Sequence, residues 1–325
     1  MMIIIISFCT FLATLLSLPL YISWAKTRFK QTIREDAPDR HQHKEGTPTM
    51  GGLIFFTITA LTFSLFTLYG KTYSQLRTNF HFLIPLILIA GGNFLLGFID
   101  DTLKVLRKRN LGLKARHKFI VHILIALLTF YLYKRWNIPT TIEFYTWHLD
   151  IGLWYILWLF FIISGTSNAV NLTDGLDGLA STIAILSLLP YTVIGDSMST
   201  TLALLLVSSL LAYLWYNSYP AEVFMGDSGS LFIGGVIAWL ALYTKTEPYL
   251  IFWALIFWVE ALSVILQVIY FKFTRGKRIF KMSPIHHHFE LSGWSEPQIV
   301  YRFATVQLWA TLLGLATFLS LHVNF

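Results

Sequence analysis

The chain has 325 residues, of which 55% are hydrophobic and only 13% are charged, and its formal net charge is +7. This composition excludes an ordinary soluble domain and predicts an integral membrane protein. The positive charge does not indicate a nucleic-acid-binding protein, because most of it lies in loops between apolar segments, where basic residues set topology. We therefore expect an all-α polytopic membrane protein with one integral domain over residues 1–325.

Apolar segments of spanning or near-spanning length follow one another along the whole chain. The first lacks a basic leader and a clear small-residue cleavage site, so we expect it to be retained as a helix. The only cysteine, Cys9, lies in it, which excludes an internal disulfide. Residues 136–150 alternate loosely and predict a small hairpin. Ten transmembrane helices are expected, at about 2–22, 51–69, 82–99, 119–133, 151–170, 179–195, 200–217, 230–244, 249–271 and 303–322.

The basic residues are concentrated in alternate loops. Nineteen of the 24 lysines and arginines lie in the loops that contain residues 26–44, 104–118 and 272–302. The positive-inside rule places these loops in the cytoplasm and both termini outside. The acidic motifs and the histidines described below lie on the same side, so we expect a composite active site at the cytoplasmic face.

Two polar motifs precede or end the first apolar segments. Lys44 comes before a Thr-Pro-Thr turn and either neutralises a phosphate or is one more positive-inside residue. Asp100 and Asp101 end the third segment, and adjacent carboxylates repel unless they share a cation or a proton. The pair therefore suits a metal-assisted site or a base. A polar helix end is the alternative, although the helix dipole disfavours acids at a C-terminus.

The sequence NLTDGLDG follows the fifth apolar segment. Its aspartates, Asp174 and Asp177, share one face if the turn is helical, and Gly175 and Gly178 let a ligand approach the backbone. A well-capped turn is the alternative interpretation. Asn171 begins a formal glycosylation sequon, which a cytoplasmic location argues against.

Asp227 is the second residue of the sequence GDSGS, directly before the eighth segment. A helix N-cap would explain an aspartate there. The free N–H groups of a helix start also favour a phosphate, or a carboxylate that holds a metal. Phe224 precedes it at a loop edge and could stack on a base or pack in the interface.

Three consecutive histidines, His286, His287 and His288, lie in the last long loop. They cannot all bind one metal with normal geometry, and without an HExxH motif or a cysteine partner zinc is not favoured. Imidazoles are good hydrogen-bond donors to phosphates and sugars. Within the ninth segment, Glu260 and Gln267 are either functional or join helices by hydrogen bonds.

The motifs together resemble the phospho-N-acetylmuramoyl-pentapeptide transferase family, the bacterial membrane enzymes that make lipid I for peptidoglycan. The histidine segment resembles this branch in particular, whereas the aspartate motifs also resemble the wider superfamily of polyprenyl-phosphate sugar-1-phosphate transferases. The blocks that carry the resemblance are KEGTPTMGG at 44–52, GFIDD at 97–101, NAVNLTDGLDGLA at 168–180, FMGDSGS at 224–230, VEALSVILQV at 259–268 and KRIFKMSPIHHHFEL at 277–291.

The resemblance implies a Mg²⁺-dependent transfer of phospho-MurNAc-pentapeptide from UDP to undecaprenyl phosphate, giving lipid I and UMP. It assigns Asp227 to the metal and Asp100, with Asp101 beside it, to the lipid phosphate; all three are catalytic candidates. The implied substrate-binding residues are Phe224 on uracil, Lys44, Leu176 and Asp177 at the edge of the base, Thr49, Asn171 and Asp174 at the sugar and phosphates, His286, His287 and His288 at the diphosphate or amino-sugar end, and Gln267.

Several alternatives stay open at this point. The lipid phosphate attacks directly, which we favour because it is already an anionic nucleophile, or the reaction passes through a phospho-aspartate. A related enzyme could transfer GlcNAc-1-phosphate, and an ion-coupled transporter would use the aspartates as cation sites. The expected partners are the two substrates and the lipids of a bacterial inner membrane. The oligomeric state, a homodimer included, the peptide and lipid preferences and the separate roles of the histidines are not decided by the sequence.

Overall fold

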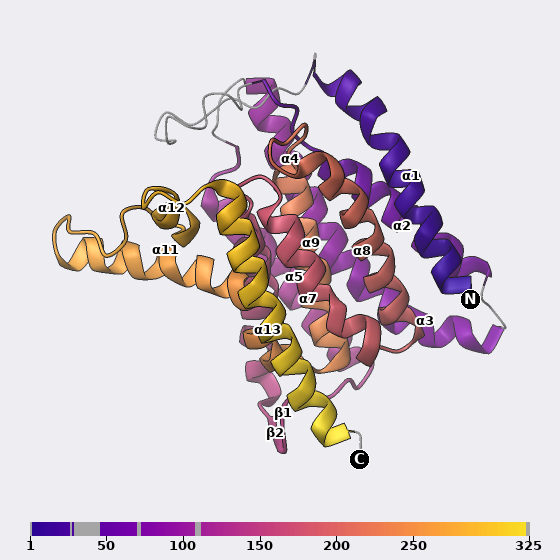
Figure 1. Ribbon diagram of the computed structural model, residues 1–325. Helices are drawn as coiled ribbons and strands as arrows, with labels where there is room; N and C mark the ends of the chain where they lie inside the picture. The colour runs from indigo at the N-terminus through magenta and orange to yellow at the C-terminus, as the bar shows by residue number, and fades with distance from the viewer. Residues whose placement is uncertain (1, 27, 29–45, 70–72, 108–111, 323–325) are drawn as a thin grey trace.

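The chain folds almost entirely into helices in the computed structural model, which describes residues 2–26, 28, 46–69, 73–107 and 112–322 (Figure 1). A two-stranded hairpin is the one sheet in these ranges. The elements are α1 Met2–Ala25, α2 Gly52–Tyr69, α3 Tyr73–Leu86, η2 Ile87–Gly91, α4 Gly92–Arg107, α5 Ala115–Arg135, β1 Thr141–Phe144, β2 Trp147–Asp150, η3 Gly152–Trp154, α6 Tyr155–Thr173, α7 Leu179–Ile194, α8 Ser197–Asn217, α9 Gly226–Thr244, η4 Glu247–Tyr249, α10 Leu250–Trp253, α11 Leu255–Phe273, α12 Ile285–Glu290 and α13 Glu296–His322.

Helix α9 lies at the centre of the bundle. It packs against α2, α4, α6 and α7, and 83% of the residues in its most apolar 18-residue stretch are buried. A helix that is apolar all round is expected to be buried, and its apolar residues from Leu231 to Leu242 are almost fully inaccessible. The first turn of α9, which carries Asp227, is therefore surrounded by neighbouring helices rather than free in solvent.

The number of helices that could cross a membrane is smaller than ten by length. Eight helices among the described residues are long and apolar enough, and two further apolar helices, Gly52–Leu68 and Leu179–Ile194, are shorter. At about 1.5 Å per residue, α7 with its 16 residues spans about 24 Å, less than the roughly 30 Å of a hydrocarbon core. The all-helical, multi-pass character is confirmed. The count of ten and the placement of the termini stay predictions.

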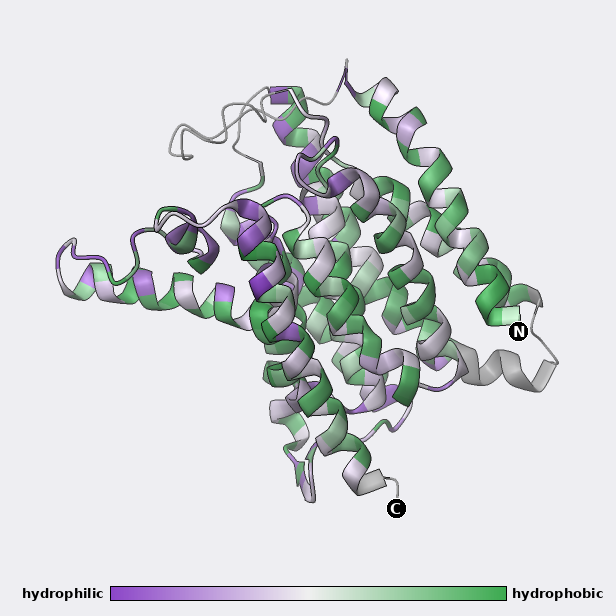
Figure 2. Cartoon of the chain, viewed as in Figure 1, coloured by the Kyte–Doolittle hydropathy of each residue, from purple (hydrophilic) through white to green (hydrophobic). Residues whose placement is uncertain are grey.

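Hydropathy and the hairpin define the two ends of the bundle. Apolar residues cover the helices along their middle parts, whereas polar residues gather in the connections at the ends (Figure 2). The predicted hairpin is confirmed, since β1 pairs antiparallel with β2 and Thr141 lies opposite Asp150. The hairpin lies at the lower end in Figure 1, and α12 lies towards the upper end.

Helix α11 departs from the direction of the other helices. In Figure 1 it extends sideways from the bundle and carries α12 beside it. It contacts α6, α10, α12 and α13, and only 28% of the residues in its most apolar 18-residue stretch are buried. The buried polar residues of α11, which are Glu260, Ser263 and Gln267, are therefore exceptions on a helix that is mostly exposed to its surroundings.

A buried carboxyl group lies between the hairpin and the bundle. Glu247 is 2% exposed, and its Oε1 accepts a 2.6 Å hydrogen bond from the hydroxyl of Tyr155. Its Oε2 has no hydrogen-bond partner among the described residues. Lys245 donates instead to the carbonyl of Pro139 and to the Tyr155 hydroxyl. Burial raises the pKa of Glu247 to about 7, against the opposing effects of Tyr155 and Lys245.

We expect the Glu247→Gln variant to lose part of the pH dependence of stability. The pKa of Glu247 is raised from 4.5 to about 7, so the folded protein holds this proton more tightly than the unfolded chain. The free energy of unfolding therefore falls as pH rises from about 4.5 to about 7, by about 3 kcal/mol, and is level above that range. Melting temperatures in detergent between pH 5 and pH 8 should fall more steeply for the unsubstituted protein. Glu222→Gln, at an exposed glutamate before α9, is the control, and equal slopes for all three proteins would contradict the prediction.

Candidate active site

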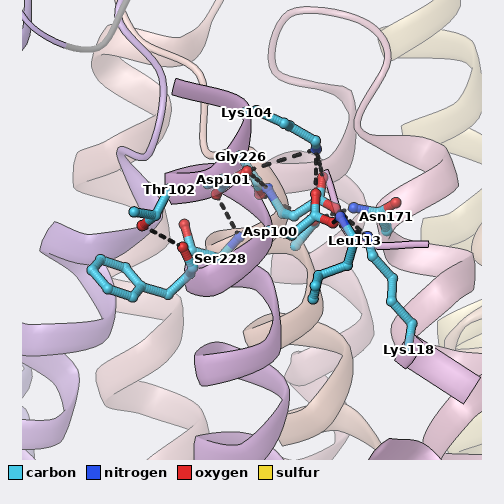
Figure 3. A network of polar contacts seen from close by, with 12 residues as sticks. Asp100, Asp101, Thr102, Lys104, Leu113, Lys118, Asn171, Gly226 and Ser228 are labelled. Atoms are coloured by element: carbon cyan, nitrogen blue, oxygen red, sulfur yellow. Dashed lines mark hydrogen bonds and ion pairs between the residues drawn. The ribbon is translucent and has the colours of Figure 1, made fainter. Parts of the chain in front are cut away.

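Three aspartates from two helices form a compact carboxylate cluster. Asp100 and Asp101 lie near the end of α4 and are 1% and 3% exposed, and Asp227 lies in the first turn of α9. One oxygen of each carboxylate lies within 4.8 Å of the other two (Figure 3). Like charges this close in a buried place require compensation by cations or N–H donors.

Asp101 accepts hydrogen bonds from the free backbone N–H groups at the start of α9. Its Oδ1 accepts from the backbone N–H of Asp227 at 3.0 Å, and its Oδ2 accepts from that of Ser228 at 2.9 Å. The first N–H groups of a helix have no partner within the helix, so this carboxylate serves as a cap from another helix. The approach of α4 needs a glycine, because a Cβ at Gly97 would overlap the carbonyl of Asp227. Asp101 thus fixes α4 against α9.

Two lysines neutralise the other two carboxylates. Lys104 on α4 lies 2.7 Å from Asp100 Oδ2 and 3.0 Å from Asp227 Oδ1. Lys118 on α5 lies 3.2 Å from Asp100 Oδ1 and 2.6 Å from Asp227 Oδ2. Each lysine therefore bridges the same two aspartates, and α4, α5 and α9 are held together by charge. The backbone N–H of Leu113 also donates to Asp100 Oδ1 at 2.7 Å.

The three carboxylates differ in what they have left to offer a ligand. Both oxygens of Asp101 accept backbone hydrogen bonds, and one oxygen of Asp100 does so. Asp227 contacts lysine side chains, which are mobile and can turn to another anion. Carboxylates and phosphate oxygens are the ligands that Mg²⁺ prefers, commonly one or two carboxylates with the rest from substrate and water. The donor set therefore fits a divalent cation, with Asp227 as the carboxylate best able to turn to it.

The NLTDGLDG loop lies next to this cluster. The Asn171 side chain donates to Ser230 on α9 at 2.9 Å. Desolvation raises the pKa of the Asp174 carboxyl well above its usual range, and the negative charges of Asp227 and Asp101 add to the effect. Asp177 is buried, and its Oδ2 accepts from the backbone N–H of Ala221 at 2.9 Å. The loop is thereby joined both to α9 and to the segment that precedes α9.

A second segment, residues 46–51, lies alongside the residues that lead into α9. The N–H of Phe224 donates to the carbonyl of Pro48, and the N–H of Gly51 donates to the carbonyl of Phe224. Thr49 faces the start of α9, since its hydroxyl oxygen lies 3.2 Å from the position that a Cβ at Gly226 would take. Thr49 and Phe224 are therefore neighbours across a short backbone pairing, with the Phe224 ring partly exposed.

The three histidines have three different surroundings. His286 is fully buried, and its Nδ1 lies 3.1 Å from Glu260 Oε2 on α11. His287 Nδ1 lies 3.1 Å from Glu290. His288 Nδ1 accepts from the backbone N–H of Lys281, so a proton on the neutral ring is carried by Nε2. Of the three, His286 reaches the NLTDGLDG loop, where it meets Gly175.

The structure thus brings most of the predicted residues into one region. Leu176 is buried within the loop, and Gln267 uses its amide on the backbone of residues 279–280. Lys44 lies outside the described residues. The positive-inside pattern accounts for Lys104 and Lys118 only as topological charges, although the four-residue spacing of Asp100 and Lys104 on one helix is a signal for an ion pair. The roles assigned to the predicted residues stay predictions.

Most of the chain is similar to known transferases. Residues 82–245 match the family described as glycosyl transferase family 4, and residues 44–56 match the phospho-N-acetylmuramoyl-pentapeptide-transferase signature 1. The chain is 42% identical over 313 residues to a phospho-N-acetylmuramoyl-pentapeptide-transferase of Geobacillus sp. (strain WCH70), with 94% of both chains covered. It is 44% identical to one of Bacillus licheniformis, again with 94% of both chains covered. It is 41% identical to one of Listeria welshimeri, with 90% and 91% covered.

We expect Asp101→Asn to reduce the free energy of unfolding by about 2 kcal/mol, because one of two charge-assisted backbone hydrogen bonds is lost and an amide N–H₂ faces an N–H donor. The measurement is thermal or denaturant unfolding in detergent at neutral pH. Asp150→Asn on the hairpin is the matched control; its carboxylate accepts from Thr140 and Gly152 but is exposed to solvent, so the substitution should change stability far less. Equal stability of Asp101→Asn and the unsubstituted protein would refute the role of Asp101 as a cap of α9.

Proposed function

The chain belongs to the phospho-N-acetylmuramoyl-pentapeptide-transferase family, and from that premise we propose that it transfers phospho-MurNAc-pentapeptide from UDP to undecaprenyl phosphate. The products are lipid I, an intermediate of peptidoglycan synthesis, and UMP. The basic loops support a site at the cytoplasmic face of a bacterial inner membrane. There a soluble nucleotide sugar and a membrane-bound lipid phosphate can meet.

The observation that carries this proposal is the bridged charge cluster at the junction of α4, α5 and α9. Both substrates are anions, so a site for their reaction must above all neutralise negative charge. Lys104 and Lys118 each contact Asp100 and Asp227 and are 29% and 21% exposed at their side chains. Two partly exposed ammonium groups beside two carboxylates form a site that can exchange internal ion pairs for substrate phosphates and a metal.

We assign the metal to Asp227, with Asp100 beside it. Mg²⁺ held there would neutralise the diphosphate of the donor and the charge that gathers on the departing UMP. Asp101 keeps its backbone hydrogen bonds to Asp227 and Ser228 and so holds the start of α9 in place. Lys104 and Lys118 would then be available to phosphate oxygens, because a metal on Asp227 competes with them for its carboxylate.

The transfer balances as a direct displacement. An oxygen of undecaprenyl phosphate forms a bond to the phosphorus attached to MurNAc, and the bond from that phosphorus to the UMP oxygen breaks. UMP leaves with the electron pair. A phosphate monoester loses its second proton at about pH 6, so a base such as Asp100 adds little beyond position.

The remaining substrate contacts are assigned to the NLTDGLDG loop, the residues before α2 and α9, and the histidine segment. Phe224 would stack on uracil, with Leu176, Asp177 and Lys44 at the edge of the base. Thr49, Asn171 and Asp174 would line the sugar and phosphate region, and the histidine segment the diphosphate. Supporting this assignment, Thr49 and Phe224 are neighbours, and Asp177 accepts from Ala221 three residues before Phe224.

We expect the purified protein to release UMP and form a lipid-linked product from UDP-MurNAc-pentapeptide, undecaprenyl phosphate and Mg²⁺. Asp227→Asn should reduce the rate by at least about 100-fold, because charge stabilisation at the reacting phosphates is lost, and a chelator should abolish it. Asp150→Asn, the same chemical change on the hairpin, should leave the rate unchanged.

Three controls define this assay. UDP-GlcNAc in place of the peptide-bearing donor should give no product. Omission of the lipid phosphate should give no UMP, whereas a stoichiometric burst would indicate a phospho-enzyme instead of direct attack. No transfer by the unsubstituted protein would refute the proposed function, and full activity of Asp227→Asn would refute the metal assignment.

We expect Lys118→Gln to lower kcat/KM by about 10- to 100-fold, the range for loss of one charge-assisted hydrogen bond in a buried site. Lys114→Gln is the matched control, since Lys114 is exposed at the start of the same helix and makes no side-chain capping bond. Initial rates with each substrate varied would provide the comparison. Equal effects of the two substitutions would show that Lys118 serves topology alone.

A further inference from the structure

Helix α11 holds the histidine segment with two polar side chains on one face. Glu260 and Gln267 are seven residues apart, which places them two turns from each other on the same side. Gln267 Oε1 accepts from the N–H groups of Ile279 and Phe280, and its Nε2 donates to the carbonyl of Phe280, each at 3.0 Å. Gln267 is therefore a clamp on the backbone of the segment.

Glu260 acts on the same segment one step further along. Its Oε2 lies 3.4 Å from the backbone nitrogen of His286 and 3.1 Å from the Nδ1 of the same residue. Glu260 is completely buried, and its Oε1 has no hydrogen-bond partner among the described residues. A buried carboxylate costs far more than a buried amide.

The contrast between the two positions indicates what the charge is for. A neutral amide is sufficient to clamp backbone, as Gln267 shows on the same helix. The carboxylate occurs at the position that faces an imidazole. A carboxylate on one ring nitrogen fixes which nitrogen carries the proton, orients the ring and balances its positive charge.

The other side of the His286 ring faces the NLTDGLDG loop. A Cβ at Gly175 would overlap His286 Nε2, so the ring lies directly against the loop backbone where a glycine leaves room. Both ring nitrogens are buried, and no described residue makes a hydrogen bond to either; Nδ1 lies at an ion-pair distance of 3.1 Å from Glu260 Oε2. Gly175 lies between Asp174 and Asp177, at the part of the loop that the proposed function gives to the nucleotide sugar.

We propose that Glu260 is a positioning residue for the transfer. Its carboxylate lies at Nδ1 of His286 and orients the ring, whose Nε2 side packs against Gly175, so that the ring holds the loop between Asp174 and Asp177 in the shape that receives the nucleoside diphosphate sugar. No bond is made or broken by the pair. The inference rests on the proposed function.

The test is a double-mutant cycle on kcat/KM for the donor with Glu260→Gln, His286→Asn and the double variant. Glutamine keeps the shape and a carbonyl acceptor and removes the charge. Glu260→Gln alone should lower kcat/KM by about 10- to 100-fold, the range for outer partners that orient a functional imidazole. In the His286→Asn background it should cost less than about 2-fold, because the residue through which it acts is gone.

A structural role of Glu260 predicts a different result. Its loss would then cost the same in both backgrounds, and that outcome, or an unchanged rate for Glu260→Gln alone, overturns the proposal. Glu143→Gln on the hairpin is the matched control and should leave the rate unchanged in either background. If Glu260→Gln fails to fold, Gly175→Ala takes its place, since the added methyl displaces Nε2. Its cost should likewise shrink in the His286→Asn background, and equal costs would overturn the proposal.

A readout that needs no turnover separates this inference from the proposed function. In protein labelled with ¹⁵N-histidine, the rings of His286 and of His287, which faces Glu290, should each show a protonated Nδ1, and the His286 signal is identified by its loss in His286→Asn. The His286 signal should be shifted in Glu260→Gln, whereas the His287 signal should stay in place in both variants. A protein that shows this pattern but transfers no sugar phosphate would refute the proposed function and leave the pair intact. A His286 signal unaffected by Glu260→Gln would refute the pair whatever the activity.

Discussion

The arrangement of the whole site depends on compensation of three buried carboxylates where α4, α5 and α9 meet. Asp100, Asp101 and Asp227 would repel one another strongly in this position. Two lysines from different helices and the free N–H groups at the start of α9 make their proximity favourable. These donors come from three helices. The contacts that relieve the repulsion therefore also fix the positions of α4, α5 and α9 relative to one another at this end of the bundle.

Chemically identical side chains acquire different capacities from this arrangement. Asp101 has both oxygens on backbone donors that cannot move without unwinding the start of α9. Asp227 is held by lysine ammonium groups, whose long side chains can turn to another anion at small cost. A cation that approaches the cluster therefore meets one carboxylate that is structurally committed and one that is exchangeable. The division of roles follows from the partners and not from the order of the residues in the sequence.

The sequence predicted the features that depend on composition or on dense local motifs. The helical membrane class, the hairpin and the association of GFIDDT, NLTDGLDG and GDSGS at one site belong to this group. Lys104 and Lys118 could not be separated from the other basic residues, because loops on the positive side of a membrane are rich in lysine whether or not it binds a substrate. The bounds of α2 and α7 agree to within one residue at each end with the predicted segments 51–69 and 179–195. Gln267 was predicted to bind substrate, and its contacts to the backbone of residues 279–280 depend on a chain reversal that no local pattern specifies.

The departure of α11 from the bundle gives its few polar residues unusual weight. The helix extends away from the helices that hold the carboxylates, so the histidine segment, which follows residue 273, must fold back along α11 to reach the loop at Gly175. Apolar packing on a helix that is largely exposed is non-directional and could not set the angle of one imidazole. Hydrogen bonds are directional and stronger where water is scarce, which is the environment of the buried face of α11. Gln267 therefore sets where the segment lies, and Glu260, seven residues earlier, sets which ring nitrogen of His286 faces the loop between Asp174 and Asp177.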